Sequence, residues 1–325
     1  MNPAFSVIFL TTLIGVGQGL FLALYTGESY AIVNVLPSQS QEFYVWGSVI
    51  SVAFLVAGLI SSIFHLGHPE RAWRAAAMWR TSWLSREVIV LPTVIGAIAV
   101  YGGVHYMGWD LTTFGIKTGV TGDLTLILGL GGVLVTFLLF LCTSMIYGCI
   151  KFLQEWATPL TVINYTLLGG ASGFTFAAVF SAYMAPSLVN FYAGWAIIIT
   201  VAALITRTAS LMRNAKIRHK SSLKTAIGVR DNRIKQTAMG FMGGSFNTRE
   251  YFHGMSILFM KSIKWIFLVL VFAVPVLLLS LAISQESTSL LIGAFVSQYI
   301  GLIAERWFFF AQANHPQNLN YQTVG

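Results

Sequence analysis

Charge is scarce in this sequence: charged residues make up 9% of its 325 residues, whereas a soluble domain usually has about 25%. This composition excludes an ordinary water-soluble domain with a charged surface. Hydrophobic residues make up 56% of the chain. They gather in uncharged runs of the length, about 20 residues, that is needed to cross a bilayer. The composition therefore indicates an integral membrane protein.

Cysteine is also rare, which limits the redox chemistry that the chain could perform alone. The two cysteines, Cys142 and Cys149, form no C-x-x-C motif, so we expect no iron–sulfur cluster in this chain. No two histidines are predicted to face each other at mid-membrane depth, so we expect neither haem nor another bound metal. There is no glycine-rich phosphate loop and no aromatic stacking platform, which argues against nucleic-acid binding.

The uncharged runs predict an all-α integral membrane protein, an eight-helix transmembrane bundle that forms a single domain over residues 1–325. The longest run, residues 156–206, is too long for one span, and Pro186 divides it into two helices because proline breaks the helical hydrogen-bond ladder. The predicted spans are residues 5–27, 43–65, 87–109, 124–150, 157–184, 187–206, 263–285 and 287–306.

Lysine and arginine are distributed very unevenly between the two sides that these spans define. Eighteen of the 19 fall on the side of the termini, and Lys117 is the exception. Positive residues collect on the cytoplasmic side of membrane proteins. We therefore expect an inner-membrane protein with both termini in the cytoplasm.

The segment "FHLGHPERAWRAAAMWRTSWLSRE", residues 64–87, joins the second and third spans and concentrates ionisable residues. A topology-fixing loop accounts for its four arginines, and a helix-capping role could account for Glu87. Both His65 and Glu87, however, stand where the chain enters hydrocarbon, and a charge is costly there. A histidine can switch protonation near pH 7 and a partly buried glutamate can carry a proton. This pair suits a quinone, which gains or loses two protons per turnover.

"HLGHPERAW", "TSWLSREV" and the "VGQGLF" of the first span together resemble the pattern of the dimethyl sulfoxide reductase membrane-anchor family. The resemblance implies a haem-free subunit that tethers a molybdopterin subunit and a four-cluster iron–sulfur subunit and exchanges electrons with quinone. It implies quinone-binding roles for His65 and Glu87, and it extends to Arg71 and Gln18. We expect Arg71 and Arg86 to keep Glu87 from being fully protonated.

"GGSFNTREYFHG" and "RWFFFAQANHPQNLNYQ", in the second half, resemble the anchor of cytoplasmic sulfite-oxidising molybdoenzymes. This implies electron transfer from sulfite oxidation to ubiquinone or menaquinone. One alternative is a quinol-oxidising anchor of a dimethyl sulfoxide or polysulfide reductase. An alternative from another class is a secondary transporter or anion channel, which the absence of charge at the predicted midplane disfavours.

Residues 207–261 form a predicted cytoplasmic loop with eleven lysines and arginines against Asp231 and Glu250. The charge could serve topology alone, but structureless loops of this length are uncommon and often functional. We expect the loop to dock the iron–sulfur partner through Arg230, Arg233, Lys235 and Arg249.

Polar residues inside the remaining spans are expected to join helices by hydrogen bonds, as for Asn164 and Gln298. Pro275 is predicted to kink the seventh span. Glu305 and Arg306 are predicted to close the eighth span in a structural role.

Overall fold

A computed structural model describes residues 1–114, 116, 123–218, 222–231, 233–235 and 250–320, and within these it contains no β-strand. Eight helical segments are long and apolar enough to cross a membrane, which confirms the predicted eight-helix architecture. They are α1 (Phe5–Ile32), α2 (Gln41–Ile63), α3 (Trp83–Met107), α4 (Asp123–Gly148), α5 (Pro159–Met184), α6 (Val189–Ala215), the continuous segment Ile257–Gln285 and α11 (Thr288–Ala311).

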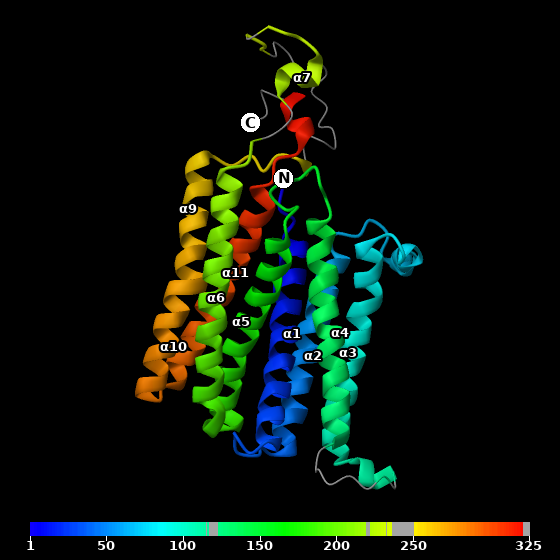
Figure 1. Cartoon of the computed structure of the whole chain (residues 1–325), viewed down its shortest axis with the longest axis vertical. Coiled ribbons are helices and arrows are strands. Elements are labelled where there is room, and N and C mark those ends of the chain that lie inside the picture. Colours follow the sequence, from blue (N-terminus) through cyan, green and yellow to red (C-terminus); the bar gives the residue numbers. More distant parts are fainter. Residues whose placement is uncertain (115, 117–122, 219–221, 232, 236–249, 321–325) are drawn as a thin grey trace.

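Short helices lie between these spans or, in the case of η5, after the last of them. They are η1 (Pro69–Met78), η2 (Leu111–Phe114), η3 (Pro186–Leu188), α7 (Leu223–Ile227) and η5 (Pro316–Asn320). The N-terminus, the C-terminal segment, α7 and η1 all lie at one end of the bundle, and η2 lies at the other (Figure 1). We call these the termini end and the opposite end.

Helices α1 and α5 form the centre of the bundle. Their apolar windows are 78% and 67% buried, whereas no other span exceeds 39%. Glycines on both helices allow this close approach, because a Cβ added at Gly173 would collide with the backbone of Gly19, and one at Gly19 with Gly169. Small residues bring transmembrane helices into contact in this way. The seam holds α1 rigidly where it carries Gln18.

The seventh span changes its helical form before Pro275. It consists of α9 (Ile257–Leu268), the π-helical turn η4 (Val269–Ala273) and α10 (Val274–Gln285). Proline lacks the N–H that would bond the carbonyl four residues earlier, and α11 supplies replacement donors. Ser297 donates to Leu270 O at 3.2 Å and Gln298 donates to Val271 O at 3.4 Å. Gln298 thus joins helices, as its sequence context predicts.

Several spans extend beyond the residues expected from their uncharged runs, and in α1 and α6 the extension buries a charged residue. Helix α1 passes residue 27 and buries Glu28, and α6 passes residue 206 and buries Arg207. A buried charge is tolerated where polar partners meet it: Glu28 accepts hydrogen bonds from Tyr101 and Thr125, and Arg207 pairs with Glu305. The 207–261 connection therefore begins inside a helix, and its first arginine is part of the bundle.

Candidate functional site

Glu87 lies in the first turns of α3, at the termini end, and its side chain points into the bundle. The helix begins after Ser82, whose side chain accepts a hydrogen bond from Ser85 N. Only 6% of Glu87 is exposed. Thr143 of α4 donates its hydroxyl to Glu87 Oε1 at 2.5 Å. A residue that the sequence places at a helix entrance is therefore a buried acid bonded to a neighbouring helix.

Gln18 of α1 also bonds α4, at a position nearer the middle of that helix. Its Nε2 donates to Thr136 O at 3.1 Å, and the side chain is 1% exposed. Gln18 and Thr143 line one internal cavity together with Thr11, Thr12, Tyr165 and Arg306. The cavity measures ≈ 10 Å³, which is room for about one water molecule. It joins the surroundings of Glu87 to the centre of the bundle.

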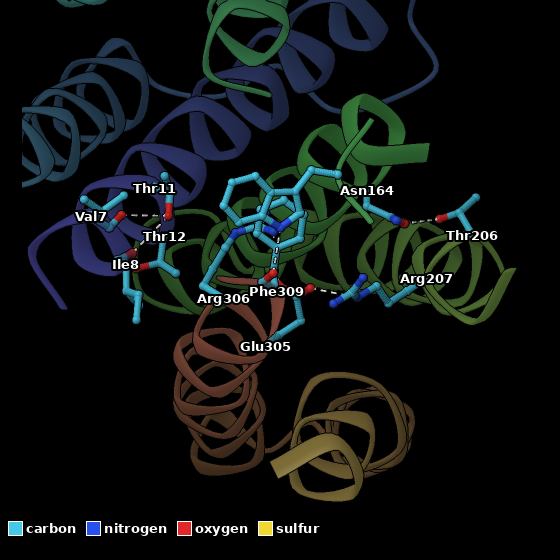
Figure 2. A network of polar contacts seen from close by, with 11 residues as sticks. Val7, Ile8, Thr11, Thr12, Asn164, Thr206, Arg207, Glu305, Arg306 and Phe309 are labelled. Carbon is cyan, nitrogen blue, oxygen red and sulfur yellow. Dashed lines mark hydrogen bonds and ion pairs between the residues drawn. The ribbon is translucent and has the colours of Figure 1, made fainter. Parts of the chain in front are cut away.

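A group of buried ions adjoins this cavity through Arg306, which is part of its lining (Figure 2). Glu305 of α11 pairs with Arg207 Nε of α6 at 2.7 Å and with Arg306 Nη1 at 3.1 Å. None of the three side chains is more than 4% exposed. The Arg306 guanidinium also lies 3.7 Å from the ring centroid of Tyr165. Arg306 thus stands between the Glu305 carboxylate and the cavity that Thr143 lines.

Hydrogen bonds between the surrounding helices hold these ions in place. Thr206 of α6 donates to Asn164 Oδ1 of α5 at 2.8 Å (Figure 2). Trp156 Nε1 donates to Phe309 O of α11 at 2.9 Å. These hydrogen bonds join α6 and α11, which carry the ions, to α5 and to the segment just before it.

The other predicted site residues lie nearer the surface. His65 follows the end of α2 and is exposed, and partial burial lowers the pKa of its imidazole below 6.5, so the ring is mainly neutral at pH 7. Arg71 is exposed in η1 and lies 3.6 Å from Glu70. In the part of the chain that the structure describes, no hydrogen bond or ion pair joins His65 or Arg71 to Glu87. Glu87 and Gln18, by contrast, both form hydrogen bonds with residues of α4.

Arg86 ties the η1 connection to α3. Its Nε donates to Trp79 O at 2.9 Å and its Nη2 to Arg80 O at 2.8 Å, while its guanidinium stacks 4.1 Å from the Trp83 ring centroid. These contacts use the charge of Arg86 to order the backbone before α3.

Arg230, Arg233 and Lys235 lie exposed in the segment that follows α7, at the termini end. Arg233 N donates to the Asp231 carboxylate at 2.9 Å. The fourth predicted docking residue, Arg249, lies outside the described residues. Side chains from three of the four docking positions are therefore available to a partner at that end.

The opposite end carries a buried acid, Glu28, with a group of polar partners that the sequence did not predict. Glu28 accepts hydrogen bonds from Tyr101 at 2.6 Å and Thr125 at 2.5 Å, and its carboxylate lies 3.3 Å from His105 Nε2. Glu28 and His105 border an open cavity of ≈ 620 Å³. Its signal in the sequence is that Glu28 is followed by further residues of helical character, SYAIV, so that the first span need not end at residue 27.

Among the residues that the structure describes, no three histidine, cysteine or acidic side chains gather where they could hold a metal ion. The groups that the site does offer are a buried carboxylate, hydroxyls, an amide and two arginines. Such groups can bind oxygen atoms and hold or pass a proton.

The family model for DMSO reductase anchor subunits (DmsC) matches residues 1–311. A sulfite dehydrogenase subunit of Allochromatium vinosum is 55% identical over 324 residues, which cover 100% of both chains. A phosphatidylglycerol–prolipoprotein diacylglyceryl transferase of Symbiobacterium thermophilum is 28% identical over 157 residues, 44% of this chain and 56% of its own. The first two matches include all of the predicted quinone-binding residues, whereas the third covers less than half of the chain.

Proposed function

Since the chain belongs to the DMSO reductase anchor subunit (DmsC) family, we propose that it passes electrons from a partner iron–sulfur subunit to quinone. The chain is a multi-pass membrane protein and the membrane anchor of a multi-subunit oxidoreductase. The full-length identity of 55% to a sulfite dehydrogenase subunit supports sulfite as the electron source, oxidised by a molybdopterin subunit. The observation that carries the quinone role is the buried, hydrogen-bonded Glu87 beside a polar cavity.

The quinone ring would lie at the surface of the bundle. The internal cavity holds about one water molecule and cannot admit a ring. The ends of α2 and α3 instead expose apolar side chains: Phe64 is 82% exposed and Leu84 is 51% exposed. These residues flank His65 and Glu87 in sequence. An apolar ring therefore has a surface to bind beside the exposed imidazole of His65.

His65 and Glu87 would divide the handling of protons between them. When bound, quinone accepts two electrons and two protons. The neutral imidazole of His65 can donate one hydrogen bond to a carbonyl oxygen. The carboxyl of Glu87 can hold a proton while its Oε1 stays bonded to Thr143. Arg71 and Arg86 add positive charge on the water side, which favours the ionised carboxylate after its proton has left.

The partner would bind at the termini end. The basic segment after α7, with Arg230, Arg233 and Lys235, can attract an acidic protein surface. The N-terminus and η5, the last described helix, lie at this end (Figure 1). The positive-inside rule assigns this end to the cytoplasm, which would place the sulfite-oxidising subunits on the cytoplasmic face of the inner membrane.

The purified complex provides the test of this function. With Glu87→Gln, sulfite should still reduce the partner's clusters, but reduction of a quinone analogue should fall because the titrating group is gone. His65→Ala should raise the KM for quinone, because it removes a hydrogen bond to a carbonyl oxygen, which contributes about 0.5–1.5 kcal/mol.

Glu42→Gln is the matched control, since Glu42 is an exposed acid in the first turn of α2, at the opposite end. It should leave quinone reduction unchanged. Quinone reduction at the unmodified rate in both the Glu87 and His65 variants would exclude the site. Reduction of the clusters by a quinol, but not by sulfite, would reverse the proposed direction.

A further inference from the structure

The membrane-spanning helices bury two acids and two arginines at the termini end, within the described residues. They are Glu87 of α3, Arg207 of α6, and Glu305 and Arg306 of α11. Their formal charges sum to zero when both acids are ionised. Glu155 is a further buried acid at this end. It lies outside the spans and interacts electrostatically with the amino-terminal group. The four charges are thus balanced as a set.

Within the set, the charges are not paired evenly. Glu305 is shared between Arg207 and Arg306, at 2.7 and 3.1 Å. Two arginines therefore share one adjacent carboxylate, and this group carries one excess positive charge. Glu87, in contrast, has a hydroxyl partner, Thr143, and no arginine bonded to it in the described chain. The excess positive charge of the Arg207–Glu305–Arg306 group therefore equals the negative charge of Glu87, from which it is separated.

The cavity brings a group bonded to each half of this set to one space. Thr143, which donates to Glu87, and Arg306, which bonds Glu305, line the same space of ≈ 10 Å³. Glu87 and Arg306 also both lie within electrostatic range of Tyr147 and Tyr165. In this low-dielectric interior, charges act on each other over longer distances than in water.

We propose, in addition to the quinone role assigned to Glu87, that Arg306 is the counter-ion that allows Glu87 to ionise inside the bundle. Glu305 and Arg207 adjust the strength of this effect, because Glu305 offsets one positive charge and Arg207 offsets Glu305. Arg306 is thereby a positioning residue: it holds no quinone but sets the pH at which Glu87 releases its proton.

The other groups around Glu87 leave Arg306 as the internal source of positive charge. From α1, Gln18 presents a neutral amide to the cavity, and from α4, Thr143, Tyr147 and Cys142 present groups that are uncharged at neutral pH. Tyr165 of α5 is likewise neutral. Arg86, the other cation near Glu87, is bonded to the carbonyls of Trp79 and Arg80 toward the surface.

This arrangement predicts shifts of opposite sign for neighbouring residues. Arg306→Gln leaves the set with a net negative charge, so Glu87 should keep its proton to a higher pH, by about one pH unit. Glu305→Gln leaves a net positive charge, so Glu87 should lose its proton at a lower pH. The double variant restores neutrality and should return the titration toward that of the unmodified protein. A purely structural role for these residues predicts no such pattern.

The experiment uses the purified complex and follows the carboxyl band of Glu87 by infrared difference spectroscopy across a pH series. The band is assigned by its loss in Glu87→Gln. Arg306→Lys retains the charge and should titrate like the unmodified protein. Arg213→Gln is the charge-matched control, because Arg213 bonds Gln154 O and Asn214 at the same end but does not line the cavity.

The pH profile of quinone reduction is measured on the same samples, which separates the two proposals. If the titration midpoints of Glu87 move as predicted but quinone reduction does not depend on Glu87, the counter-ion is supported and the quinone role is overturned. Midpoints that stay in place in both Arg306→Gln and Glu305→Gln would overturn the counter-ion, whatever happens to activity. If Arg306→Gln does not assemble, Glu305→Gln and the double variant still test the direction in which the titration midpoint of Glu87 moves.

Discussion

At the scale of single residues, the chemistry of the bundle depends on partners that helices far apart in sequence supply. Glu87 and Gln18 were marked by their sequence patterns, but the pattern could not show that α4 serves both of them through Thr143 and Thr136. Arg207 looked like the first residue of a basic loop because it follows a long uncharged run. Its burial depends on Glu305 of α11, and no local signal reveals that counter-ion.

Thr143 offers a direct test of how much Glu87 depends on its neighbour. Thr143→Val keeps the shape but removes the donor to a buried carboxylate, which should cost about 1–3 kcal/mol of folding free energy. The purified complex should therefore melt at a lower temperature, and Glu87 should hold its proton more firmly. Thr143→Ser keeps the hydroxyl and is the control. Equal melting temperatures for the valine and serine variants would show that this hydrogen bond contributes little.

At the scale of elements, the eight spans followed from composition because lipid leaves a chain few alternatives to apolar helices. The ends of the spans did not follow so simply. Uncharged runs stop at the first charged residue, whereas α1 and α6 continue past Glu28 and Arg207. The kink expected at Pro275 takes the form of a π-helical turn, because Ser297 and Gln298 can satisfy the freed carbonyls. These details depend on tertiary contacts.

The α1–α5 seam should tolerate little added volume. Gly173→Leu would force a side chain into the backbone of Gly19, so the two central helices would have to separate. We expect loss of the folded protein from membranes, measured as a large fall in yield and in protease resistance. Gly194→Leu is the control on neighbouring α6, because a Cβ there meets open space. Similar losses in both variants would show that the seam is not specially constrained.

At the scale of the whole molecule, the proposed orientation places both termini and the segment around α7 in the cytoplasm. Reporter fusions after Gly325 and at Lys224 should both report a cytoplasmic location. The reason is the imbalance of 18 lysines and arginines to one across the two sides. Periplasmic activity of either fusion would contradict the orientation.

Partner binding is also a property of the whole assembly, and the basic segment should control it. Reversal of Arg230, Arg233 and Lys235 to glutamate should release the catalytic subunits from membranes at low salt, because attraction to an acidic surface becomes repulsion. Reversal of Lys261 and Lys264, which lie in α9, is the control for charge reversal outside the basic segment. Subunits that stay bound to the triple variant across a salt series would leave the segment with a topological role alone.

The location of Glu87 near one end of α3 has an energetic consequence for a membrane that carries a voltage. Glu87 is the fifth residue of the helix, about 6 Å along its axis from the start, so a proton that reaches it from the termini end crosses only a small part of the electric field. A proton that came from the cavity beside Glu28 would cross most of it, at about 2.3 kcal/mol per 100 mV. Proton supply from the nearer end is therefore almost electroneutral, and quinone reduction should run equally fast in energised and in uncoupled membranes.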